Sequence, residues 1–233
     1  TFREVTHKSW FSRIAGAFAG IFFGLLFILG SIIMLFFNEG RAIKTEKALK
    51  LGAKTVVSIN PNEIDPQNDG KLVHVTGFAK TDEILEDKEF NIKENAIRLK
   101  RIAEMYQWDE NKSSKTKKNV GGGTTTETTY SYNKQWSSSL IKSSDFKKPD
   151  GHQNPSSMPY HSESYTAKDI WLGKFFVPKN LSDQINDFSD YSVTNLPPDK
   201  NAKLANGEIY FGADPSSPAI GDVKISYEII KPL

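Results

Sequence analysis

The chain contains no cysteine among its 233 residues. Disulfide bonds, thiolate nucleophiles and cysteine-ligated metals are therefore excluded. Histidine is also scarce: the four histidines are scattered, and no His-Glu-x-x-His motif of a zinc enzyme is present. The net charge is only +2, so the composition makes no general case for nucleic-acid binding.

Catalytic motifs are missing as well. No Gly-x-Ser-x-Gly elbow is present, and two Ser-x-x-Lys matches, Ser139–Lys142 and Ser144–Lys147, lack the companion motifs of their enzyme class. The glycines that begin at Gly121 are not followed by Lys-Ser or Lys-Thr, so they do not form a phosphate loop. We expect a protein that is not an enzyme, with no catalytic residues, no cofactor and no metal.

The most informative stretch is a long run without charge. Ile14–Phe37 has 24 residues and holds no Asp, Glu, Lys, Arg, His, Asn or Gln. As a helix it would span about 36 Å, enough to cross a hydrocarbon core of about 30 Å. A cleaved signal peptide would be shorter and end in a small-x-small site, and a core helix of this length usually carries polar residues. We therefore predict one transmembrane helix, with the lipid bilayer as its partner.

Three glycines inside this run lie on one helix face. Gly16, Gly20 and Gly24 are four residues apart, so they form overlapping Gly-x-x-x-Gly patterns where a second helix can approach closely. Glycine is also common in membrane helices that make no such contact. Both the helix-packing interpretation and this simpler one remain open.

The residues after the run predict the domain boundaries. Asn38, Glu39, Gly40 and Arg41 follow it directly, and we expect them to set the exit from the membrane and the docking of the next domain. We divide the chain into a flank (1–13), the transmembrane helix (14–37), a juxtamembrane helix (38–52) and a β-rich domain (53–233). Three basic residues precede the run and four closely follow it, so charge does not decide the orientation.

The rest of the chain has strand patterns. Ala96–Trp108 alternates, with Ile97, Leu99, Ala103 and Met105 on one face, and Thr126–Ser138 is the return strand of a long hairpin. Thr81–Glu89 is predicted to be a short helix or an acidic loop. The fold class that follows is α+β, with an amino-terminal transmembrane helix before an antiparallel, β-rich domain.

A basic segment lies between the two hairpin strands. It contains Lys112, Lys115, Lys117 and Lys118, followed by three glycines. We predict a flexible hairpin tip here. It either contacts anionic lipid or an acidic partner, or it is simply a solvated loop.

The motifs, taken in order, resemble the LUMA family (transmembrane protein forty-three). The first block consists of NEGRAIKT, GKLVHVTG and RLKRIAEMYQW, and the second of YSYNKQW, GHQNPSSM and GDVKISYE. The resemblance runs from about Trp10 to Glu228. Its most specific parts are Glu104–Trp108 and Tyr130–Asn133.

The resemblance implies a function that the residues alone do not. Family members have an amino-terminal span, a large extracytoplasmic or lumenal domain, and three further spans near the carboxyl end, so this sequence looks like a partial chain. Eukaryotic members lie in the endoplasmic reticulum and the inner nuclear membrane of the nuclear envelope, where they self-associate and organise membrane protein assemblies. No catalytic residue is established for the family, so none is assigned here.

The resulting prediction is an integral membrane scaffold. It would form homo-oligomers and assemble other membrane proteins, without binding nucleic acid. Its soluble domain would be periplasmic on a bacterial inner membrane, or lumenal in a eukaryote. An extracytoplasmic lipid- or ligand-binding module is the alternative, and an envelope hydrolase is a third, weaker one.

Overall fold

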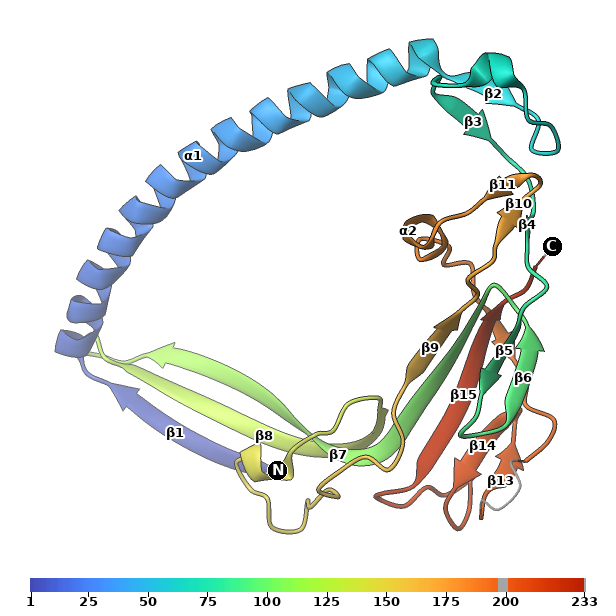
Figure 1. Cartoon of the computed structure of the whole chain (residues 1–233). Helices are drawn as coiled ribbons and strands as arrows, with labels where there is room; N and C mark the ends of the chain where they lie inside the picture. The colour runs from blue at the N-terminus through green and yellow to red at the C-terminus, as the bar shows by residue number, and fades with distance from the viewer. Residues whose placement is uncertain (197–200, 233) are drawn as a thin grey trace. The chain divides into compact units, whose positions relative to one another are not determined.

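The computed structural model describes residues 1–196 and 201–232. The predicted β-rich domain includes residues 197–200 and 233, which lie outside this description. The chain divides into two compact units. We call Thr1–Ser58, Asp65–His74 and Asn111–Ser131 the helix unit, and Ile59–Ile64, Val75–Glu110 and Tyr132–Leu233 the sheet unit. Figure 1 shows the elements of both.

One helix, α1 (Trp10–Thr55), dominates the helix unit. Ser9 caps its amino-terminal end, and the Ser9 hydroxyl accepts a hydrogen bond from the backbone N–H of Ser12 at 3.3 Å. None of its residues is buried. Among the described residues it is the one helix long and apolar enough to cross a membrane. The predicted span and the predicted juxtamembrane helix are parts of this single helix, because neither Gly40 nor Gly52 interrupts it.

The amino-terminal flank is a strand, which the sequence did not lead us to expect. β1 (Phe2–Lys8) pairs antiparallel with β8 (Thr124–Ser137), from Phe2 opposite Tyr130 to Lys8 opposite Thr124. Arg3 forms an ion pair with Glu127 at 3.1 Å. The hydroxyl of Tyr130 donates a hydrogen bond to Glu4 at 3.2 Å. β1 therefore covers the outer edge of β8.

The long hairpin is confirmed, but its tip was placed wrongly. β7 (Arg98–Lys118) is longer than predicted, and it neighbours β8 in the sheet. The turn is formed by 119–123, where Gly121 and Gly122 have φ angles of 92° and 84° that favour glycine. The segment Lys112–Lys118 lies inside β7 and not at the tip. Its composition indicated a loop, but Ser114 and Thr116 bond to threonines on β8 across the hairpin, at 3.0 and 2.9 Å.

In the sheet unit, β7 is the central strand. It pairs antiparallel with β15 (Val223–Ile230) and with β9 (Glu163–Thr166). β15 pairs in turn with β14 (Glu208–Phe211) and β12 (Ser189–Tyr191), and β13 (Lys203–Ala205) extends the sheet. These pairings confirm the α+β class, with an antiparallel, strand-rich domain after the helix.

Smaller elements complete the fold. Two-stranded sheets are formed by β2 (Val57–Ile59) with β3 (Val73–Val75) and by β5 (Ile84–Asp87) with β6 (Ile92–Asn95). A three-stranded sheet contains β4 (Ala79–Lys80), β10 (Trp171–Leu172) and β11 (Phe175–Phe176). The short helices are η1 (Pro66–Asn68), η2 (Ser143–Asp145) and α2 (Lys179–Ser182).

The region Thr81–Glu89 was predicted wrongly as a helix or an acidic loop. β5 lies within it, with Leu85 and Asp87 buried and alternating with more exposed neighbours. The acidic composition concealed this alternation, because an inward carboxylate is uncommon unless it has a partner. The partner of Asp87 comes from β7.

The core of the sheet unit follows the predicted alternation. Leu99, Ala103 and Met105 on β7 are buried, together with Ile225 and Ile229 on β15. β-strand side chains alternate between the two faces, so Arg101 must share the buried face with Leu99 and Ala103. It does, at 1 % exposure.

Candidate functional site

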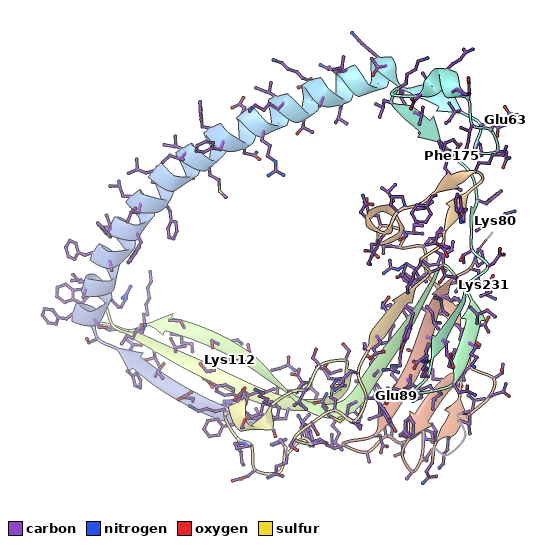
Figure 2. All side chains as sticks on the ribbon, viewed as in Figure 1. Glu63, Lys80, Glu89, Lys112, Phe175 and Lys231 are labelled. Atoms are coloured by element: carbon purple, nitrogen blue, oxygen red, sulfur yellow. The ribbon has the colours of Figure 1, made fainter. Side chains whose placement is uncertain are left out.

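The three glycines predicted to pack against another helix lie open on α1. Apart from the backbone of α1 itself and the two neighbouring residues, a methyl group added at Gly16, Gly20 or Gly24 would meet no atom of the described chain within 4 Å. Figure 2 shows the side chains of α1 projecting from the helix. This face, which we call the glycine face, is free to receive a second helix.

The predicted membrane-exit residues lie in the middle of α1. Asn38, Glu39, Gly40 and Arg41 are all exposed. The chain after α1 contacts this helix near its carboxyl end, at Gly52. A Cβ placed on Gly52 would lie 3.6 Å from the side chain of Leu72. The carbonyl of Leu72 accepts a hydrogen bond from the backbone N–H of Val57 at 3.0 Å.

The four lysines predicted as an anionic contact do not form one patch. They are exposed on β7 in the helix unit, and Lys112 is labelled in Figure 2. Because strand side chains alternate, Lys112 and Lys118 lie on one face while Lys115 and Lys117 lie on the other. Lys112 also makes a cation–π contact with Tyr130: its ammonium nitrogen lies 5.7 Å from the centroid of the tyrosine ring.

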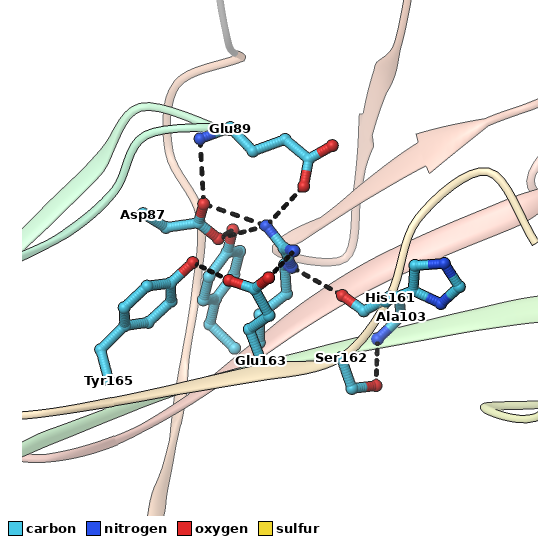
Figure 3. A network of polar contacts seen from close by, with 9 residues as sticks. Asp87, Glu89, Ala103, His161, Ser162, Glu163 and Tyr165 are labelled. Carbon is cyan, nitrogen blue, oxygen red and sulfur yellow. Dashed lines mark hydrogen bonds and ion pairs between the residues drawn. The ribbon is translucent and has the colours of Figure 1, made fainter.

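The sheet unit contains a buried ionic cluster that the sequence did not reveal. Arg101 on β7 donates two hydrogen bonds to Asp87 at the end of β5, at 3.0 and 2.8 Å. It forms further ion pairs with Glu89 at 2.9 Å and, more distantly, with Glu163 of β9 at 3.7 Å. Figure 3 shows these contacts converging on one guanidinium.

Two more elements join this cluster. The Nε of Arg101 donates to the carbonyl of His161 at 2.9 Å. Tyr227 of β15 donates its hydroxyl proton to Asp87 at 2.7 Å, and Tyr165 of β9 donates to Glu163 at 2.6 Å. The cluster therefore links β5, β7, β9 and β15 through side chains.

The charges in this cluster are held in place electrostatically. Burial lowers the pKa of Arg101, but Asp87, Glu89 and the two nearby tyrosines together raise it more, so the guanidinium stays charged. Burial and the hydrogen bond to Asp87 raise the pKa of Tyr227, so its hydroxyl remains a donor. Asp87 is fully buried, and among the residues that the structure describes Arg101 is the cation that balances its charge, so the pair fixes β5 against β7.

A motif used for the resemblance also has a structural role. Asn154, from GHQNPSSM, accepts a hydrogen bond from the backbone N–H of Trp108 at 2.7 Å and donates to its carbonyl at 2.9 Å. A third bond reaches the carbonyl of Ile141 at 3.0 Å. The asparagine thus imitates a neighbouring strand and fastens its loop to β7.

Over the described ranges 1–196 and 201–232, no three His, Asp or Glu residues are grouped so that they could hold a metal.

Replacing Arg101 with methionine is expected to lower the free energy of unfolding by about 3–5 kcal/mol, because Asp87 would remain buried without its cation. Denaturant unfolding in detergent micelles, followed by tryptophan fluorescence, measures the change. The control is Lys100→Met, which removes a half-exposed ion pair with Glu228 and should cost less than about 1 kcal/mol.

A second substitution sharpens this experiment. Adding Asp87→Asn to Arg101→Met removes the buried, unpaired carboxylate and should recover part of the lost stability. Equal losses for the Arg101 and Lys100 variants would show that the buried cluster does not hold the sheet unit together.

The family model and the curated relatives that match this chain carry the same name. A family model described as Transmembrane protein 43 matches residues 105–233. The human Transmembrane protein 43 is 34 % identical over 224 residues, which is 95 % of this chain and 56 % of the human protein. The mouse protein of that name is 35 % identical over 217 residues, 92 % of this chain and 54 % of its own length.

A more distant relative carries the same family name. The Drosophila melanogaster Transmembrane protein 43 homolog is 27 % identical over 208 residues, 88 % of this chain and 55 % of the fly protein. The chain thus spans about half the length of the curated relatives it matches. No solved structure matches it.

Proposed function

The chain belongs to the transmembrane protein 43, or LUMA, family, and we propose that it is a scaffold that self-associates and assembles other membrane proteins. It is an integral membrane protein, and α1 is its anchor. In this proposal its role is not enzymatic. Its strand-rich part lies on the extracytoplasmic side, in the lumen of the endoplasmic reticulum and nuclear envelope of a eukaryote or in the periplasm of a bacterium.

The glycine face is the observation that carries the proposal. A helix inside lipid gains nothing from burying apolar side chains against a partner, so close backbone approach is what favours association. Gly16, Gly20 and Gly24 permit this approach, and nothing in the described chain occupies the space beside them. A second copy of α1, or a helix of another membrane protein, can fill it.

Replacing both Gly20 and Gly24 with leucine is expected to shift the solubilised protein toward monomer, because the added side chains prevent close helix contact. Light scattering, corrected for bound detergent, measures the mass. Ala15→Leu is the matched control, since Ala15 lies about 140° around the helix from Gly20. If the double variant keeps the mass of the parent multimer, helix packing through the glycine face is wrong.

Lipid binding by the strand domain is the second candidate function. Lys115, Lys117 and Lys118 are exposed and make no ion pair with any other residue that the structure describes. Free lysine side chains near a membrane surface attract anionic headgroups. The alternation of the four lysines over both faces of β7 weakens this candidate, because only part of the charge can face one surface.

Vesicle clustering distinguishes the two functions. Full-length protein in zwitterionic liposomes would bridge to added anionic vesicles and raise light scattering if the lysines of β7 bind lipid. Changing Lys112, Lys115, Lys117 and Lys118 to glutamine should then abolish clustering, as should high salt. The control changes four exposed lysines elsewhere: Lys88, Lys168, Lys174 and Lys231. The scaffold proposal predicts no clustering with any of these proteins.

A further inference from the structure

The pairing of β1 with β8 conflicts with a membrane crossing by α1. β1 lies immediately before α1, whereas β8 lies after it in the chain. If α1 crosses the bilayer, Lys8 and Val56 lie on opposite sides. No second helix among the described residues could carry the chain back across.

β1 and β8 cannot pair across the bilayer, because the distance is too large. Paired strands lie about 4.8 Å apart, whereas the hydrocarbon core is about 30 Å thick. All residues from Val56 to Thr124 are therefore on the far side from β1 when α1 is inserted. The contacts of Arg13 and Trp10 with Gly122 at the hairpin tip are lost for the same reason.

We propose that β1 separates from β8 when α1 crosses the bilayer, and that the opened edge of β8, Thr124–Tyr130, pairs with the same edge of a second copy of this chain. The proposal rests on the self-association proposed above and names a surface for it outside the membrane. This surface is distinct from the glycine face.

The opened edge has the character of a pairing surface. The structure already shows it accepting seven residues of an antiparallel strand. Its sequence is TTTETTY, rich in β-branched threonine, with no proline and no lysine to block strand addition. Glu127 is its single charge, and it loses its partner Arg3 when β1 leaves.

A second copy fits this edge better than an unrelated strand. Copies anchored in one bilayer by the same helix present the edge at the same height, so their effective concentration is high. Antiparallel pairing of identical strands obeys a two-fold axis, the commonest symmetry of homo-oligomers. A register centred on Thr128 separates the two Glu127 side chains and places Thr126 opposite Tyr130.

The absence of cysteine makes a direct test available. Full-length protein is reconstituted in liposomes with single cysteines at each position from Thr124 to Tyr130, and mild oxidation forms disulfide dimers. The expected result is several-fold more dimer at Thr128 than with Ser217→Cys, an exposed position outside the edge. Absence of dimer above this control at every position would overturn the edge contact.

A double variant tests the release of β1. Thr6 and Thr126 face each other in the structure, so Thr6→Cys with Thr126→Cys reports the β1–β8 pairing. We expect no intramolecular bridge in liposomes. Near-complete bridging there would overturn the proposal, because the edge of β8 would still be covered.

The outcomes separate this inference from the proposed function. A multimer by light scattering that gives no cross-link along β8 would leave self-association standing and remove this surface. A monomer would remove both.

Discussion

The apolar surface of α1 is the constraint on which the rest of the structure depends. Fifteen large apolar side chains between Phe18 and Phe37 are exposed on it. Leaving each in water costs about 1.5–3 kcal/mol, while each cross-strand pair of β1 with β8 contributes roughly 0.2–1 kcal/mol. Lipid around α1 therefore outweighs the seven pairs that hold β1. If α1 crosses the bilayer, the described residues after it lie together on one side, because no other described helix could cross.

A second constraint acts inside the sheet unit. Arg101 occupies a buried position on β7 and makes bonds that reach β5, β9 and β15. A register slip of one residue would turn Arg101 to the opposite face and leave Asp87 buried without a cation. The cluster therefore disfavours other strand registers, at the expense of desolvating its charges. It therefore favours a single arrangement of the strands in the sheet unit.

Sequence reasoning succeeded where a pattern was local. The length and lack of charge of Ile14–Phe37 predicted a membrane helix, and α1 contains it. The alternation in Ala96–Trp108 predicted a strand with one buried face, because a period of two is visible within a few residues. The family resemblance, which used motifs over nearly the whole chain, is confirmed by the family model and the relatives.

It failed where structure depends on distant partners. Asp87 lies 14 residues from Arg101 and 140 from Tyr227, so its burial could not be inferred from its acidic neighbours. Lysines and glycines in 112–123 concealed the last residues of β7, where Ser114 and Thr116 bond to threonines on β8. Arg101 itself did leave a signal: it falls at an inward position between Leu99 and Ala103.

Sidedness of labelling tests the central claim most directly. In sealed microsomes that contain the full-length protein, a membrane-impermeant maleimide is added to Thr6→Cys and, separately, to Ser217→Cys, before and after detergent. The account predicts that the cysteine at position 6 reacts in intact vesicles and that the one at position 217 reacts only after detergent. Equal reactivity of both positions in intact vesicles would contradict a single crossing by α1, and with it the account of how this chain is anchored.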